Sequence, residues 1–151
     1  MKDKIKYKAK GIYALKIGES ISFLKTISET DIYLFAGITG DFSPNHINKE
    51  YMKLNKYTQR IAHGALIVGF MSTASALMGI RQRERCKNTV LVNYGYDRIR
   101  FIKPVFIGDT ITVTHTIKSI DPEESKIYSE DKVKNQREEL VAAAINIIKV
   151  L

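Results

Sequence analysis

Residues 62–85, "AHGALIVGFMSTASALMGIRQRER", are hydrophobic on nearly all sides as far as Ile80 and then become basic. A helix that is apolar all round has to be covered by other parts of a protein. Arginines in a last turn suit the negative end of the helix dipole. The stretch therefore predicts a long helix at the centre of the fold. Its apolar tract falls short of the roughly 18 to 20 residues that span a bilayer, so we expect no membrane span.

The segments before this helix predict a strand, a short helix and a long loop. Residues 20–28, "SISFLKTIS", alternate in the manner of a strand, and Ser28 or Thr30 then caps a helix over "ETDIYLFAGIT". From Gly40 to about Arg60 the pattern is irregular, with glycine, proline and three asparagines, and one turn of helix is expected around "KEYMKL". Ordered loops of this length are usually functional.

Beyond the helix the pattern changes to strict alternation and predicts four strands. They cover residues 89–102, 109–120, 125–133 and 139–150 and are joined by turns, so we expect an antiparallel meander. One strand, a short helix, a long helix and a meander make an α+β protein of the hot-dog type, with an antiparallel sheet wrapped around a central helix. Since the sheet covers one side of that helix, a loop or a partner must cover the rest, and we expect a homodimer or a higher homo-oligomer.

Composition limits the setting and the partners. The 151 residues, 44% of them hydrophobic, fit a single domain over residues 1–151, with residues 1–15 as a flexible basic end. Cys86 is the one cysteine, which excludes an intrachain disulfide and favours a cytoplasmic protein. The net charge of +8 favours phosphate-bearing partners. The charges are dispersed and no nucleic-acid-binding motif accompanies them, so a phosphorylated small molecule is the better candidate.

An acid and an imidazole stand close together in the long loop. In "FAGITGDFSPNHINKEYM", residues 35–52, Asp41 and His46 are five positions apart with Pro44 between them. Alone, Asp41 is a common turn residue and His46 a common surface residue. Together they are a pair suited to general acid and base catalysis, and we expect both on a loop outside the core.

Three stretches carry a family resemblance. The runs "GDFSPNH", "AHGALIVGF" and "YGYDRIRFIKPVFIGDTITV" resemble those of MaoC-type hydratases, and most of all R-specific enoyl-coenzyme A hydratases, over roughly residues 20–150. The sequence departs from the common form of this family at Ser43, where asparagine is more frequent, and at Asn45, where an aliphatic residue is usual. These differences concern the packing of the loop more than the chemistry.

The resemblance implies hydration of trans-2-enoyl-CoA to (R)-3-hydroxyacyl-CoA, or the reverse dehydration, without cofactor or metal. Asp41 and His46 would act on one water, and the sequence leaves open which takes the first proton. The resemblance also points to the backbone N–H of Gly64, at the positive start of the central helix, as the group that stabilises the thioester oxygen. We expect His63 to cap the helix or line the loop, His115 to be a core or interface histidine, and Asp109 to lie in a turn.

The remaining candidates concern substrate binding. Arg98 and Arg100 are expected on one face of a strand with a bulge at Gly95, where they and Lys103 could meet coenzyme A phosphates or acids across a dimer. The acyl pocket would be lined from the central helix and the loop, by residues that fit a core equally well: Phe42, Tyr51, Met52, Leu66 and Phe70. The acyl chain length stays open.

Three alternatives remain. A hot-dog thioesterase would bind the same ligand but has no need of an Asp–His pair, and it would release free thiol. A non-catalytic acyl-CoA sensor would lose the pair and carry a DNA-binding segment. Within the hydratase interpretation, a 3-hydroxyacyl dehydratase that acts on an acyl carrier protein thioester is a rival, because an acidic carrier also suits a basic surface.

Overall fold

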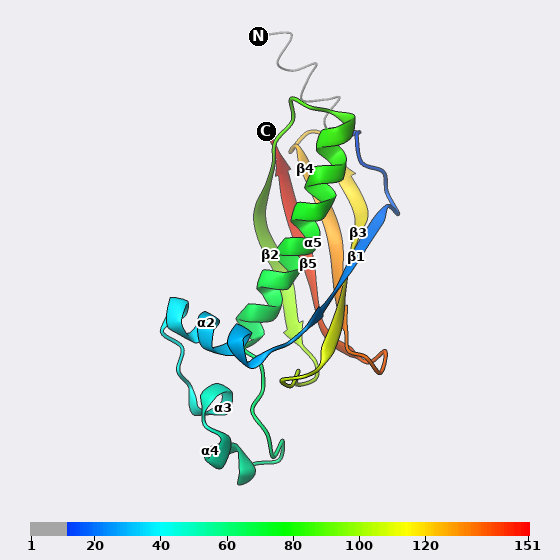
Figure 1. Cartoon of the computed structure of the whole chain (residues 1–151). Helices are drawn as coiled ribbons and strands as arrows, with labels where there is room; N and C mark the ends of the chain where they lie inside the picture. The colour runs from blue at the N-terminus through cyan, green and yellow to red at the C-terminus, as the bar shows by residue number, and fades with distance from the viewer. Residues whose placement is uncertain (1–11) are drawn as a thin grey trace.

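The computed structural model describes residues 12–151. The expected α+β hot-dog architecture is confirmed: a five-stranded antiparallel sheet carries one long helix on its face, and three short helices lie beyond one end of it (Figure 1). Residues 1–11 of the expected basic end lie outside the described residues, whereas Ile12 and Leu15 are buried. The elements are β1 (Ser20–Thr26), α2 (Glu29–Thr39), α3 (Pro44–Ile47), α4 (Lys49–Lys53), α5 (Gly64–Arg85), β2 (Leu91–Phe101), β3 (Thr110–Asp121), β4 (Lys126–Lys134) and β5 (Leu140–Val150).

The strands are arranged in the order β1-β3-β4-β5-β2. The expected four-strand meander is therefore wrong: only β3, β4 and β5 follow one another in the sheet, and β2 lies at the far edge beside β5. The reason is the connection from β2 to β3, residues 102–109, which is longer than the two to five or so residues of a hairpin. It crosses the end of the sheet and bonds to other segments, for instance through Ala62 N–H to the Val105 carbonyl at 2.8 Å.

Helix α5 lies along the sheet and buries one of its faces. Ile67, Met71, Ala74 and Met78 recur at helical spacing and are at most 2% exposed. The opposite face, which includes Ala65, Gly69, Thr73, Ala76 and Ile80, is exposed in the single chain. By length and composition alone α5 could cross a membrane, so the expectation that this tract is too short is wrong. It packs on β1, β2 and β3 instead.

A polar layer divides the core under α5. His115 on β3 and Asp131 on β4 are opposite each other and fully buried, with His115 Nδ1 and Asp131 Oδ1 2.6 Å apart. Ser129 and Asn146, paired across β4 and β5, are buried beside them. Apolar clusters lie on either side, one around Met71 and the other around Met78. The expectation that His115 is a core histidine is confirmed.

Candidate active site

The chain between α2 and α4 is shaped by its local sequence to bring Asp41 and His46 together. Ser28 and Asp31 form the expected capping box at the start of α2, and Gly40, at φ 79°, ends the helix in the left-handed conformation that glycine adopts without strain. Pro44 then starts the single turn of α3, which carries His46. As a result an oxygen of Asp41 and ring nitrogens of His46 and His63 lie within 4.8 Å of one another.

Asp41 has an exposed side chain that is held by Ser43. The backbone N–H of Ser43 donates to Asp41 Oδ1 at 3.2 Å, and the Ser43 hydroxyl donates to the same oxygen. These two bonds stabilise the carboxylate and lower the pKa of Asp41 below its usual value of 3.8. Ser43, the departure from the common family form, thus supports an ionised Asp41.

His46 is buried, and its tautomer follows from its partners. Nδ1 lies 2.8 Å from the Ile61 carbonyl, which can only accept, so Nδ1 carries the proton. Nε2 then has a free lone pair, to which the Asn45 side-chain amide donates at 3.1 Å. Burial lowers the pKa of His46 below 6.5, against the opposing effect of the bond to Ile61. The expectation that this residue lies outside the core is wrong: only 8% of it is exposed, because α3 turns it inward.

His63 packs against the pair. Its ring stacks on the ring of His46, with centroids 3.8 Å apart and 27° between the planes. Its Nε2 lies 3.0 Å from the backbone carbonyl of Asp41, so Nε2 donates. His63 stands at the N-cap position of α5 but makes no side-chain capping bond. Of the two expected roles, lining the loop fits and capping does not. No sequence pattern predicts the stacking, since residues 17 positions apart meet only in the fold.

Gly64 is the first residue of α5, where a backbone N–H has no partner within the helix. The ring of Phe101 lies directly against it: a Cβ built on Gly64 would come within 2.5 to 2.9 Å of three atoms of that ring. Only glycine therefore fits beside Phe101 in this conformation. The arrangement leaves the backbone of Gly64 open to close approach by a ligand.

A cavity of about 300 Å³ opens between the loop, the start of α5 and the end of the sheet. Its lining includes Asn45 and His46 from the loop, Gly64 from α5, Phe101 from β2, Val105 from the connection after it and Ala142 from β5. The five predicted acyl-pocket residues are not among its lining residues. Of residues 101–105, the sequence predicted a binding role for Lys103 alone; the rest of this lining was missed, because most of it lies on the crossing connection after β2.

The predicted acyl-pocket residues occupy other positions. Met52 is 1% exposed and belongs to the core. Leu66 and Phe70 are half-buried against the core cluster around Met71. Phe42 and Tyr51 are more than half exposed. Their part in substrate binding stays a prediction.

The three predicted basic residues lie near the end of β2. The register shift between Asn93 and Gly95 confirms the expected bulge. The prediction that Arg98 and Arg100 share a face assumed that side chains alternate regularly along the strand. A second register shift lies between Asp97 and Arg100, and Arg98 has a φ of 53°, so this regular alternation is interrupted between the two arginines. Lys103 lines the cavity.

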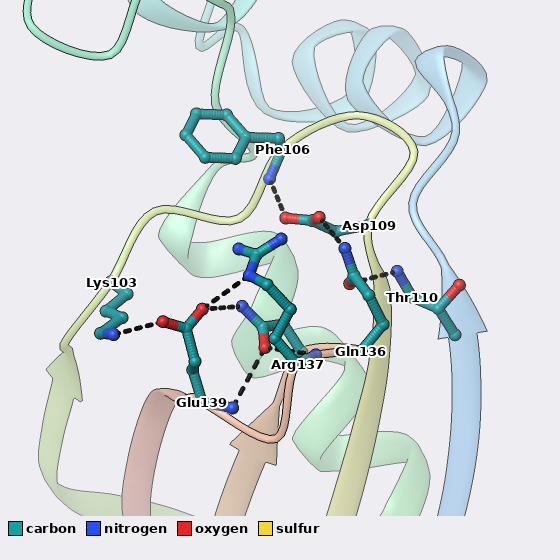
Figure 2. Close-up of polar contacts among 8 residues, drawn as sticks. Lys103, Phe106, Asp109, Thr110, Gln136, Arg137 and Glu139 are labelled. Carbon is teal, nitrogen blue, oxygen red and sulfur yellow. Dashed lines mark hydrogen bonds and ion pairs between the residues drawn. The ribbon is translucent and has the colours of Figure 1, made fainter.

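Lys103 belongs to a network at the mouth of the cavity. Its Nζ lies 2.6 Å from Glu139, which also accepts from Asn135 and Arg137 of the β4–β5 turn (Figure 2). These three donors lower the pKa of Glu139 to about 2. Asp109, expected in a turn, is buried there; it accepts from the Phe106 N–H at 2.8 Å and from Gln136 (Figure 2). The network fixes the crossing connection to the β4–β5 turn.

Among the described residues, one group of three histidine, cysteine or carboxylate side chains lies close enough together to be considered for a metal ion. It consists of Asp41, His46 and His63. Both nitrogens of His46 already have partners, and Nε2 of His63 donates to a carbonyl. The two rings also lie face to face, so their lone pairs do not point at one centre. The arrangement suits proton transfer better than chelation.

Comparison with known proteins agrees with this geometry. Residues 14–139 match the family model described as the MaoC like domain. A protein of Rhodospirillum rubrum named (R)-specific enoyl-CoA hydratase is 43% identical over 109 residues, 72% of this chain and 70% of that protein. A 3-hydroxybutyryl-CoA dehydratase of Methylorubrum extorquens is 31% identical over 109 residues. The aligned part covers 72% of this chain and 64% of that protein.

A solved structure shows the same fold. The unliganded R-hydratase PhaJ1 from Pseudomonas aeruginosa superposes with a TM-score of 0.77 and 26% identity, over 91% of this chain and 83% of that one. The family model spans most of the chain, from before β1 to the start of β5. This chain therefore belongs to the MaoC-like domain family.

Proposed function

We propose that the protein is an (R)-specific enoyl-CoA hydratase, which adds water to a trans-2-enoyl thioester and also catalyses the reverse dehydration. The observation that carries the proposal is a neutral imidazole, His46, which lines a cavity together with the first residue of α5, and an ionised carboxylate, Asp41, within 4.8 Å of a ring nitrogen of His46. The names of the similar R. rubrum and P. aeruginosa proteins support the reaction and its stereochemistry.

The protonation states assign roles to the two residues. His46 is assigned the role of the base, because its Nε2 keeps a lone pair while Nδ1 donates to the Ile61 carbonyl; the Asp41 carboxylate is instead stabilised by two bonds from Ser43, which lower its pKa. A water that replaces the Asn45 amide at His46 Nε2 loses a proton to that nitrogen as its oxygen bonds to the β-carbon. Asp41 accepts the other hydrogen of the water and orients it. The electron pair of the double bond moves toward the thioester oxygen, and the proton on His46 is then delivered to the α-carbon, on the same face.

The N–H of Gly64 stabilises the enolate oxygen in this scheme. An N–H at the start of a helix has no partner within the helix and lies at the positive end of the helix dipole. It can therefore bond to an anion without breaking a bond within the helix. Donors of this kind are commonly worth 10² to 10³ or so in rate. Lys103, Arg98 and Arg100 are the candidates for contact with the phosphates of coenzyme A, since all three are exposed and Lys103 lines the cavity.

We also propose that the protein acts as a homodimer. On the described chain β2 pairs with β5 alone, so its other edge has no strand beside it. The outward face of α5 is exposed, and so are Ile80 and Tyr94, at 55% and 63%. A free edge next to an uncovered apolar helix face is typical of an interface with a second chain.

The test is to incubate the purified protein with crotonyl-CoA and to follow both the loss of the enoyl thioester and the chirality of the product. We expect (R)-3-hydroxybutyryl-CoA, formed without added metal or cofactor and unaffected by a chelator. An (S) product, or release of free thiol from saturated acyl-CoA in place of hydration, would contradict the proposal. The same assay with crotonyl thioester on an acyl carrier protein decides which carrier the basic surface serves.

A further inference from the structure

His63 touches each of the three groups to which the proposed reaction assigns a role. It is covalently joined to Gly64, its Nε2–H donates to the backbone carbonyl of Asp41 at 3.0 Å, and its ring stacks on His46 at 3.8 Å. Ser43, within the same loop, also contacts both Asp41 and His46, through Asp41 Oδ1 and the His46 N–H, whereas His63 reaches them from the start of α5. It is also 1% exposed, which is unusual for a histidine beside an open site.

We propose that His63 is a positioning residue, which fixes the distance between Asp41 and His46 and covers one face of the His46 ring, so that His46 stays a neutral base. The proposal rests on the proposed function, because it concerns how that site is kept ready. His63 does not itself touch the substrate in this account.

The hydrogen bond to Asp41 restrains the loop. Asp41 follows the left-handed Gly40 and precedes α3, so its backbone has no helix to hold it. The bond from His63 ties this backbone to the start of α5, which is anchored on the sheet. A shift of a catalytic group by about 1 Å can lower the reaction rate on the order of 100-fold. A restraint on the backbone of Asp41 therefore matters for turnover.

The stacked ring controls the surroundings of His46. Burial is the main cause of its lowered pKa, and the charges that act on it within the described chain come from His63, which lowers the pKa, and Asp41, which raises it. His63 covers one face of the His46 ring. Nδ1 of His63 is buried and has no hydrogen-bond partner among the described residues, so the ring is held through Nε2 and through its stacking on His46.

Two substitutions separate the roles of the ring and of the hydrogen bond. His63→Gln places an amide donor near the position of Nε2 and removes the ring. His63→Phe keeps a flat ring and removes the donor. Phe35→Leu is the matched control, because Phe35 also packs on the His63 ring, at 4.8 Å, and has no assigned role in the reaction.

The measurements are kcat and KM as functions of pH, melting temperature, and titration of the His46 ring by NMR. For both His63 variants we expect kcat to fall by about 10-fold to 100-fold, with KM changed by less than about threefold. The titration midpoint of His46 should rise in His63→Gln, where the ring is exposed, and should rise less in His63→Phe. Phe35→Leu should lower the melting temperature without moving that midpoint.

The proposal is wrong if both His63 variants keep the wild-type kcat and the wild-type titration of His46, or if Phe35→Leu reproduces their effects in proportion to its loss of stability. The NMR titration needs no turnover. A wild-type protein without hydratase activity would therefore remove the proposed function, while the effect of His63 on His46 would still be measured separately.

Discussion

At the scale of single residues, the site depends on the protonation states of Asp41 and His46, which could not be predicted from the sequence. The spacing of Asp41 and His46 predicted an acid–base pair, but their charge depends on contacts made in the fold. Ser43 lowers the pKa of Asp41, and burial lowers that of His46, which α3 turns inward. Because His46 is buried and bonded to Ile61, its replacement by alanine would disturb the loop as well as the chemistry. A test of its role needs a substitution that keeps this bond.

The same pKa shifts predict the pH dependence of the reaction. His46 must be unprotonated to accept a proton from water, so kcat/KM for hydration should fall as the pH falls through the folded-state pKa of His46. That pKa lies below 6.5, and the pKa of Asp41 lies lower still, below 3.8. We therefore expect an acid limb with a midpoint below 6.5 and full activity at neutral pH, measured as kcat/KM with crotonyl-CoA. A midpoint at or above 6.5 would mean that His46 is not shielded as described.

At the scale of helices and strands, the sequence predicted which elements exist better than how they are arranged. Period-two and helical patterns placed every strand and both main helices, and Ser28 marked the start of α2. Alternation does not tell which strands pair, so the edge position of β2 was missed. Most of the cavity lining from residues 101–105 was missed for a related reason. Their place follows from the edge position of β2 and from the crossing connection that starts there.

The polar layer across β3 and β4 is a further element that the sequence did not reveal. His115 and Asp131 are each other's recorded partners, and both are fully buried. Removing one member of such a pair leaves a buried polar group without its partner and commonly costs about 1 to 3 kcal/mol. We expect Asp131→Ala to lower the free energy of unfolding by about that amount, measured by urea denaturation. Asp131→Asn keeps an acceptor for His115 Nδ1 and should cost clearly less; equal losses would show that the pair is not what stabilises this layer.

At the scale of the whole molecule, the uncovered surfaces point to a second copy of the chain. The outward face of α5 is exposed, and within the described chain the edge of β2 that faces away from β5 has no strand beside it. Phe101, the last residue of β2, lines the cavity. We expect light scattering to give the mass of a dimer or a higher oligomer. Replacing Ile80, which is 55% exposed, by lysine should weaken the assembly, whereas the same change at Thr58, on the distant loop, should not. A fully active monomer would contradict this expectation.

The central claim is that Asp41 and His46 act on one water, and the most direct test is kcat/KM for Asp41→Asn, His46→Asn and the double variant, measured beside their melting temperatures. Asn at position 46 can keep a donor toward the Ile61 carbonyl while it removes Nε2, and Asn at position 41 can still accept from Ser43. Loss of a positioned acid or base commonly costs on the order of 10² to 10⁴ in rate. We predict losses of this size in each single variant, little further loss in the double variant, and melting temperatures near that of the wild type. Near-normal turnover in either single variant, or a loss of activity that follows a loss of stability, would contradict the account.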